Sequence, residues 1–415
     1  MTPARNAQAA PSSGVGAQLV FAGLNLVLTA PSVYLWLGLP LLMREQGWSA
    51  WALGLFQLAS LPAVLKFVMG TVIDRYPGSA DRTAGYRRWA TGLVCAYAAV
   101  LLALGWRVGL DRPLGLFALA GLAAVLATWA DIPVNALAIR RLPAQQQPLA
   151  GGLRSLALSV GAIVGGGLML LVQARWGWAA PFLLMALALL VGLCGLWLLP
   201  LRGAQSHLGQ DRVLADPSWR ELVAGYFRQT HAPAWSVLLM GGFAFIGAAW
   251  FYLKPMLLDL GWSVQQAAAV AGVQGGLLAA LAALATSGLT RRFGAIRTLP
   301  WCMGLNTVAL LALAAAAGAA GSNTLALRAA VWSAAIAMGA SSSCLFGLMM
   351  RFARSGTQAA DYGLQASLFS LSRLLVPVAA GATLDAGGAP LMLCVLAAGA
   401  ALMAGWAWRS RRWLA

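Results

Sequence analysis

The chain has 415 residues, of which 60% are hydrophobic and 9% are charged, and its formal net charge is +17. This composition excludes a water-soluble globular protein, because a fold of this length cannot bury so much apolar surface. The positive charge would indicate nucleic-acid binding in a soluble protein, but basic loops on one face of a membrane protein explain it more simply. We therefore expect a protein embedded in a lipid bilayer, without a nucleic-acid partner.

Apolar stretches long enough to cross about 30 Å of hydrocarbon recur along the chain. Twelve of them can be delimited, at 17–42, 50–73, 86–107, 113–139, 149–173, 177–200, 234–258, 265–290, 296–320, 324–350, 361–385 and 388–408. The predicted fold class is therefore an all-α polytopic membrane protein with 12 transmembrane helices. Residues 1–16 contain one Arg and no apolar core, so we expect a short disordered tail there.

Basic residues divide unequally between the two faces of this twelve-span arrangement. Twenty of the 28 Lys and Arg, Arg154 among them, fall on one face. Six fall on the other face, namely Arg44, Arg107, Arg112, Arg175, Lys254 and Arg328. The positive-inside rule assigns the basic face to the cytoplasm, which predicts that both termini, including a tail at 409–415, are cytoplasmic.

The longest polar stretch, at about 201–233, separates the first six spans from the last six. We thus expect an N-terminal six-helix bundle at 17–200, a cytoplasmic central loop at 201–233 and a C-terminal bundle at 234–408. A weak repeat relates the halves, since Leu-Pro-Leu-Leu-Met-Arg-Glu-Gln-Gly-Trp-Ser at 39–49 matches Lys-Pro-Met-Leu-Leu-Asp-Leu-Gly-Trp-Ser at 254–263. Chance similarity between apolar segments is the alternative. Two related six-helix bundles are typical of a secondary transporter of the major facilitator type, whose substrate site lies between the halves.

A candidate gating motif lies between the second and third spans, where Gly70-x-x-x-Asp74-Arg75 is followed by Arg87 and Arg88. In outline this matches the signature of major facilitator transporters at the same place. The glycine would let a neighbouring helix approach closely. Asp74 would pair with arginines or cap the adjacent helix, and so latch the inward-closed state. A solvated charged loop is the alternative interpretation.

Two opposite charges lie inside the second and fourth spans. Lys66 is eight residues before Asp74, about 12 Å from the cytoplasmic end at 1.5 Å per residue. Asp131 lies at nearly the same depth, and Asn135 follows it by one helical turn on the same face. An ion pair between Lys66 and Asp131 would relieve the cost of burying each charge. The pair is interpreted either as a proton-titratable or substrate-binding site, or as a structural salt bridge between helices.

Arg373 lies near the middle of the eleventh span, and no carboxylate precedes Asp385 within that span. A cation at this depth is a candidate for binding an anionic group of the substrate. The alternatives are that its side chain extends to the membrane interface or pairs with Asp131.

A polar stripe runs along the first span, where Asn25, Thr29, Ser32 and Trp36 recur at helical spacing. A helix that faces only lipid would not carry such a stripe, so we expect these residues to line the substrate site. The repeat aligns this stripe with a smoother, more aromatic face of the seventh span, which contributes Trp250 and Phe251.

Several functions are not supported by any motif. The chain has no Gly-x-x-x-x-Gly-Lys-Ser/Thr loop, and its only two histidines, His207 and His231, both fall in the central loop. The five cysteines lie in separate apolar spans without Cys-x-x-Cys spacing, so we expect neither disulfides nor a metal site. An enzymatic activity is therefore not expected.

Four segments together resemble a known family. Leu65-Lys66-Phe67, Asp74-Arg75-Tyr76, Ala130-Asp131-Ile132, and Leu142-Pro143 before a Gly-rich fifth helix look like the AmpG-like branch of the major facilitator superfamily. That branch includes AmpG muropeptide permeases, acetyl-coenzyme A transporters and the shorter RhtX/FptX siderophore permeases of the bacterial inner membrane. The resemblance covers about residues 20–200, and the second half only by topology.

Two departures from the AmpG pattern favour the RhtX/FptX type. This chain has Ala130 and Asn135 where AmpG-like proteins commonly carry Gln and a second Asp, and it has twelve spans where AmpG has more. The resemblance implies a monomeric importer in the bacterial inner membrane that takes up a pyochelin-like siderophore, free or ferric. Asp131 would carry the coupling proton with Lys66 as its partner, and no cofactor is implied besides the proton motive force, with iron only as cargo. A muropeptide (anhydrosugar-peptide) permease is the alternative, and a non-transporting membrane scaffold is a third possibility.

Overall fold

The computed structural model describes residues 12–46, 56, 64–76, 79, 81–109, 112–200, 218–318 and 324–414. These residues are almost entirely helical. Ten of the helices in this part of the chain are long and apolar enough to cross a membrane, and the longest of them contains two spans. The remaining predicted span, at 50–73, falls largely outside the described residues and is represented by α4.

The N-terminal half is built from six spans. The first comprises α1 (Ser12–Val33), a π-helical turn (Tyr34–Gly38) and α2 (Leu39–Glu45), and the second ends in α4 (Lys66–Arg75). The next two are α5 (Arg82–Arg107) and α6 (Pro113–Arg141). The fifth comprises α7 (Gln147–Ile163), a second π-helical segment (Val164–Leu168) and α8 (Met169–Trp176), and the sixth is α9 (Ala179–Leu198).

The C-terminal half repeats this organisation. Its first span is α11 (Ala232–Asp259), and its second comprises α12 (Val264–Ala267), a π-helical segment (Ala268–Gln274) and α13 (Gly275–Phe293). The next two are α14 (Ala295–Gly318) and α15 (Thr324–Arg351). The last two spans lie within α16 (Gln358–Leu414), which turns back at Gly387 and Gly388. Gly388 has a φ of +73°, which favours glycine because it has no Cβ.

Three boundaries differ from the sequence-based expectation. Helix α1 begins at Ser12, inside the stretch expected to be a tail, and α16 continues helically through 409–414. The expected central loop contains a helix, α10 (Trp219–Phe227), whereas 201–217 lies outside the described residues. Ser218 and Glu221 form a reciprocal capping box at the start of α10, which explains why a helix begins there.

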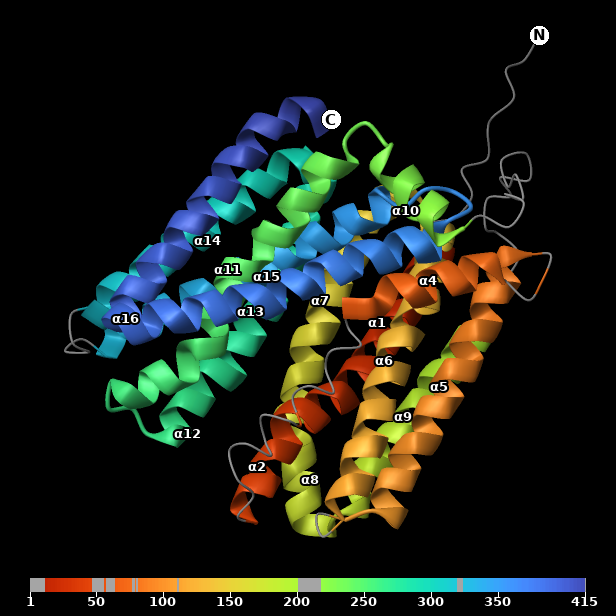
Figure 1. Cartoon of the computed structure of the whole chain (residues 1–415), viewed down its shortest axis with the longest axis horizontal. Helices are drawn as coiled ribbons and strands as arrows, with labels where there is room; N and C mark the ends of the chain where they lie inside the picture. Colours follow the sequence, from red (N-terminus) through yellow and green to blue (C-terminus); the bar gives the residue numbers. More distant parts are fainter. Residues whose placement is uncertain are drawn as a thin grey trace.

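Figure 1 shows the two halves side by side, with α1 to α9 in red to yellow-green and α11 to α16 in green to blue. Helix α7 lies at the boundary, beside α13 and α15. Small residues bring the helices of the two halves into contact. A Cβ on Gly151 of α7 would lie only 2.4 Å from the backbone nitrogen of Gly347 of α15, so the two backbones touch.

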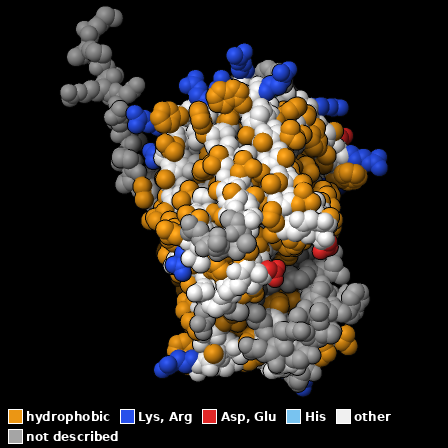
Figure 2. Space-filling model, turned by 90° about the vertical axis from the view of Figure 1, so that its left-hand side faces the viewer, with side chains coloured by type: hydrophobic (Ala, Val, Ile, Leu, Met, Phe, Trp, Pro, Cys, Tyr) orange, Lys and Arg blue, Asp and Glu red, His pale blue; other side chains and the backbone are white. Residues whose placement is uncertain are grey.

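The outer surface is that of a membrane protein. On the face of the C-terminal half seen in Figure 2, apolar side chains cover the middle, and Lys and Arg gather at one rim. That rim is the end of the molecule where α16 terminates, next to the junctions of α13 and α14. An even number of spans separates the start of α1 from the end of α16, so both lie on the same side of the bilayer.

Candidate functional site

A buried cluster of charges lies between the halves, and we call it the Asp131 cluster. The Asp131 carboxylate of α6 accepts a hydrogen bond of 2.8 Å from the Lys66 ammonium of α4. The Arg154 guanidinium of α7 donates to both carboxylate oxygens, at 3.1 and 3.2 Å. The Tyr362 hydroxyl of α16 donates to the same carboxylate at 3.0 Å. Three of these groups come from the N-terminal half and Tyr362 comes from the other half, so the cluster spans the interface.

Two amides complete the cluster. Asn135 donates to Asp131 Oδ1 at 2.8 Å, which is the one-turn relation expected from the sequence. The Asn25 side-chain oxygen accepts from Arg154 at 3.1 Å and from Asn135 at 3.4 Å. Asn25, Asn135 and Arg154 are all buried. The network holds the carboxylate and both cations in fixed positions.

Two members of the cluster, Arg154 and Tyr362, are absent from the site expected from the sequence. The positive-inside pattern predicts that Arg154 is one of the basic residues of the cytoplasmic face, but its side chain is 8% exposed and bound to Asp131. A signal for Arg154 was present, because it lies seven residues into α7 and therefore about 10 Å from the start of that helix. That depth matches the depth of Lys66. Two cations facing one carboxylate leave the cluster with one uncompensated positive charge.

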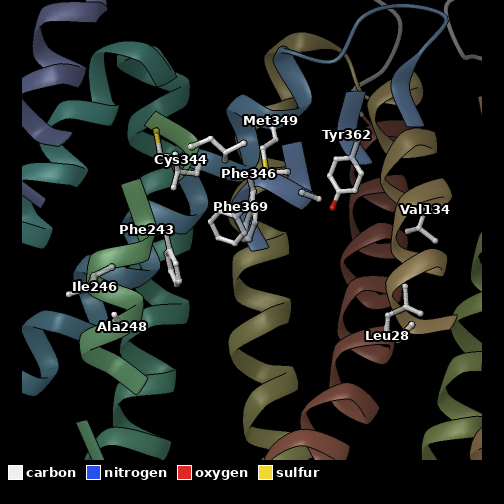
Figure 3. Close-up of a cluster of buried hydrophobic side chains, with 14 of the residues drawn as sticks. Leu28, Val134, Phe243, Ile246, Ala248, Cys344, Phe346, Met349, Tyr362 and Phe369 are labelled. Carbon is white, nitrogen blue, oxygen red and sulfur yellow. The ribbon is translucent and has the colours of Figure 1, made fainter. Parts of the chain in front are cut away.

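An aromatic group separates this cluster from Arg373. The ring of Phe369 lies 5.4 Å from that of Phe243 and 5.6 Å from that of Phe346, measured between centroids. Figure 3 shows these rings between α11 and Tyr362. The Arg154 guanidinium lies over Phe346 at 4.9 Å, and the Arg373 guanidinium lies over Phe243 at 5.5 Å and over Phe369 at 5.7 Å. The aromatic rings thus connect two cationic centres.

Arg373 lies on the face of α16 that is turned toward the other half. Tyr362, Phe369 and Arg373 are spaced at i, i+7 and i+11, so they share one helix face. Tyr362 on this face contacts Asp131 across the interface. Arg373 keeps exposed surface and makes no hydrogen bond or ion pair with the residues that the structure describes. The alternative that it pairs with Asp131 is therefore wrong, because Lys66 and Arg154 occupy that carboxylate.

The predicted gating motif forms a contact between the halves, at the start of α16. The Asp74 carboxylate accepts from the backbone N–H of Ala360, in the first turn of α16, at 2.7 Å, and also from the Tyr86 hydroxyl. A carboxylate at a helix N-terminus satisfies a free N–H and interacts favourably with the helix dipole. A Cβ on Gly70 would lie 2.3 Å from the carbonyl oxygen of Ala359, so this approach requires glycine.

The arginines of the motif are arranged differently from the expectation. Arg82 is the arginine beside Asp74, at 3.8 Å, and it also donates to the Asp74 carbonyl. Arg87 lies over the ring of Trp197 at 4.0 Å, Arg75 lies over Tyr76 at 5.4 Å, and Arg88 is exposed on α5. The sequence pattern thus identifies the carboxylate and the glycine of the contact, whereas the cation beside the carboxylate is Arg82.

Residues 19–377 of the chain match the family model described as Major Facilitator Superfamily. The chain belongs to the major facilitator superfamily. It is a membrane transporter and not an enzyme, with the twelve-helix fold of two six-helix bundles that this superfamily shares.

Solved structures agree with this fold. The proton:xylose symporter XylE, bound to 6-bromo-6-deoxy-D-glucose, superposes with a TM-score of 0.73 at 12% identity, covering 96% of each chain. The fucose:proton symporter FucP of E. coli gives 0.70 at 17% identity, covering 95% of this chain and 98% of FucP. A bacterial homologue of the iron transporter ferroportin gives 0.69 at 16% identity, covering 95% and 98%. At these identities the likeness establishes the architecture alone.

Within this major facilitator fold, the polar stripe of the first span does not form one continuous lining. Asn25 belongs to the Asp131 cluster. Thr29 packs against Gly161 of α7, and Ser32 lies within 3.4 Å of the Tyr97 hydroxyl of α5. The Trp36 ring lies 5.3 Å from that of Phe56.

The two aromatic residues expected from the seventh span also point in different directions. Trp250 packs against Gly275 at the start of α13. Phe251 is 68% exposed and contacts Tyr252, whose hydroxyl donates to the carbonyl of Pro377. Of the aromatic residues around Arg373, the sequence-based expectation included neither Phe243 nor Phe369.

Proposed function

We propose that this transporter imports an anionic, aromatic siderophore, free or ferric, across the bacterial inner membrane by proton-coupled alternating access. The observation that carries the proposal is Arg373, a guanidinium in mid-span that faces the other half and has no carboxylate partner among the described residues. Charged side chains at this depth are costly and are usually kept for the transported substrate or ion.

Charge and shape around Arg373 support an anionic aromatic substrate. The Asp131 cluster has one positive charge in excess, and Arg373 adds a second, so a neutral substrate would leave both uncompensated. Phe243, Phe346 and Phe369 offer apolar ring faces between these charges. A phenolate or carboxylate carried on an aromatic ring fits both features, because a planar guanidinium binds such oxygens in a bidentate manner.

The substrate class also rests on the resemblance to RhtX/FptX permeases, carried by Lys66-Phe67 and Asp131-Ile132. Asp131 is the candidate for the coupling proton. Protonation would remove the negative charge that holds Lys66 and Arg154, and it would weaken the bond that Tyr362 donates from the other half. Proton binding and separation of the halves would thereby favour each other.

The substrate assignment is tested by binding of a ferric phenolate siderophore, such as ferric pyochelin, to the purified protein. Arg373→Met should weaken binding about 13- to 160-fold, the factor that corresponds to a lost hydrogen bond to a charged group. Arg328→Met is the matched control. Arg328 also lies over an aromatic ring, that of Trp262, but it is near the start of α15 and not in the middle of a span. Binding of a muropeptide in place of the siderophore, or unchanged affinity in Arg373→Met, would contradict the proposal.

The coupling role is tested separately, by uptake of the radiolabelled ferric siderophore into proteoliposomes with an imposed pH gradient. Asp131→Asn should abolish accumulation of the siderophore against its concentration gradient, because a side-chain amide does not bind and release a proton in the physiological pH range. Asp259→Asn, which changes an exposed carboxylate at the end of α11, should accumulate substrate like the unmodified protein. Gradient-dependent uptake by Asp131→Asn would remove Asp131 from the coupling step while leaving the substrate assignment intact.

A further inference from the structure

A cavity lies away from the interface between the halves, at the ends of α13, α14 and α16. Its volume is about 700 Å³, within the range of about 300–1,000 Å³ that ligand pockets occupy. Three arginines and three aromatic residues line it: Arg297, Arg411, Arg412, Phe293, Trp301 and Trp408. We call it the Arg-Trp cavity. It lies outside the transport pathway proposed above, so what it binds is independent of the transported substrate.

The charge of the Arg-Trp cavity is one-sided. None of the described residues that line it is acidic. Arg297 and Arg412 are exposed, and they form no hydrogen bond or ion pair with any residue in the described part of the chain. The Arg411 guanidinium lies 3.8 Å above the centroid of the Trp408 ring. Three guanidiniums around one cavity repel one another, and an anion between them would relieve this repulsion.

The walls of the cavity are apolar and face outward. Trp301 is 70% exposed, Phe293 is 52% exposed and Trp408 is 46% exposed, and the two Trp rings meet edge to face at 5.7 Å. Tryptophans with this exposure at a span end are typical of the membrane–water interface. The ligand therefore needs both an anionic group and an apolar portion, a combination that free inorganic phosphate lacks.

The cavity opens at the basic rim of the molecule. Figure 2 shows Lys and Arg gathered at this rim above the apolar band. The positive-inside rule assigns this side to the cytoplasm. Basic pockets between transmembrane helices on this side bind the headgroups of anionic lipids.

We infer that the Arg-Trp cavity binds an anionic phospholipid of the cytoplasmic leaflet. The lipid phosphate would lie among Arg297, Arg411 and Arg412, and its acyl chains would run along Trp301 and Trp408. Such a lipid links the start of α14 to the end of α16, which are far apart in the sequence.

The test measures binding of phosphatidylglycerol to the full-length protein in detergent, by native mass spectrometry and by the rise in melting temperature. Phosphatidylethanolamine with the same acyl chains and inorganic phosphate serve as the comparison ligands. Phosphatidylglycerol should bind and stabilise, and the double variant R411Q/R412Q should bind it about 30-fold more weakly, given the usual contribution of a basic side chain near an anionic membrane surface.

R291Q/R292Q is the matched control, because it removes two exposed arginines at the same rim that do not line the cavity. It should bind phosphatidylglycerol like the unmodified protein. R297Q, on a different helix, should weaken binding in the same direction as R411Q/R412Q and so exclude local misfolding of the last turn of α16. Equal stabilisation by phosphatidylethanolamine or by inorganic phosphate, or unchanged binding in R411Q/R412Q, would overturn the inference.

Discussion

Replacing Gly70 by alanine should open the contact between α4 of the N-terminal half and α16 of the C-terminal half. The added Cβ would lie 2.3 Å from the carbonyl oxygen of Ala359, whereas ordinary contact begins at about 3.4 Å. Helices α4 and α16 would have to separate by about 1 Å, because the obstacle is backbone and cannot rotate away. The hydrogen bond from the Ala360 N–H to Asp74, now 2.7 Å, would then exceed hydrogen-bond length.

The magnitude follows from the type of bond that is lost. A hydrogen bond to a charged group contributes about 1.5–3 kcal/mol, so the population of states in which α4 and α16 are apart should rise about 13- to 160-fold. Hydrogen exchange of backbone amides reports such opening equilibria segment by segment. We therefore expect exchange in the first turns of α16 to accelerate by this factor, with no change in α14.

Gly92→Ala is the control for this experiment. Gly92 is an exposed glycine of α5 with no atom within 4 Å of the position that its Cβ would occupy. It should leave exchange in α16 unchanged. If Gly70→Ala also leaves the exchange of Ala360 and its neighbours unchanged, then α4 and α16 are not held together by this close approach, and the latch interpretation fails.

Two further predictions concern the contacts between the halves. Gly151→Leu should lower the free energy of unfolding by about 1–3 kcal/mol or more, since it inserts a side chain between the touching backbones of α7 and α15. The control is Gly288→Leu, at an exposed glycine of α13 whose Cβ would have no atom within 4 Å. It should change the melting temperature little. Tyr362→Phe removes the hydroxyl that binds Asp131 but keeps the ring, and should accelerate exchange in α16. In a double-mutant cycle with Asp74→Asn, the changes in the free energy of opening of α16 should depart from additivity by about 0.5–3 kcal/mol. Additive changes would show that the Tyr362 and Asp74 contacts open independently.

The sequence was sufficient to predict the number of spans and the division into two halves, because hydropathy is a strong signal when 60% of the chain is apolar. The proximity of Lys66 and Asp131 was also predictable, since a helix rises by a constant 1.5 Å per residue and depth can be counted along it. The same count applied to Arg154 from the start of α7 gives a similar depth. Arg154 nevertheless resembles a loop charge in the sequence, because it lies close to the end of a span.

Other features could not be obtained from one sequence. Tyr362 contacts Asp131 because α16 crosses the interface at that height, and no local pattern specifies which helices of the two halves meet. Phe243, Phe346 and Phe369 are apolar residues in apolar helices, so nothing in their neighbourhood distinguishes them from lipid-facing residues. Helix α10 is different, because Ser218 and Glu221 have the spacing of a capping box and would have predicted a helix start within the central loop.

Two buried carboxylates of the N-terminal half, those of Asp74 and Asp131, bind the same short segment of α16. Asp74 accepts from the backbone N–H of Ala360 in the first turn of α16, and Asp131 accepts from the hydroxyl of Tyr362, two residues further along. Ala360 and Tyr362 lie in one helical turn, which is too rigid for the two residues to move apart. The halves therefore cannot separate at the Asp74–Ala360 contact while Tyr362 remains bound to Asp131. Any ligand or proton that weakens the hydrogen bond between Tyr362 and Asp131 therefore also favours breaking of the hydrogen bond between Ala360 and Asp74. Arg154 of the Asp131 cluster lies over Phe346, and Arg373 lies over the neighbouring Phe369. This segment of α16 therefore links the substrate site that we propose to the contact between Asp74 and the start of α16.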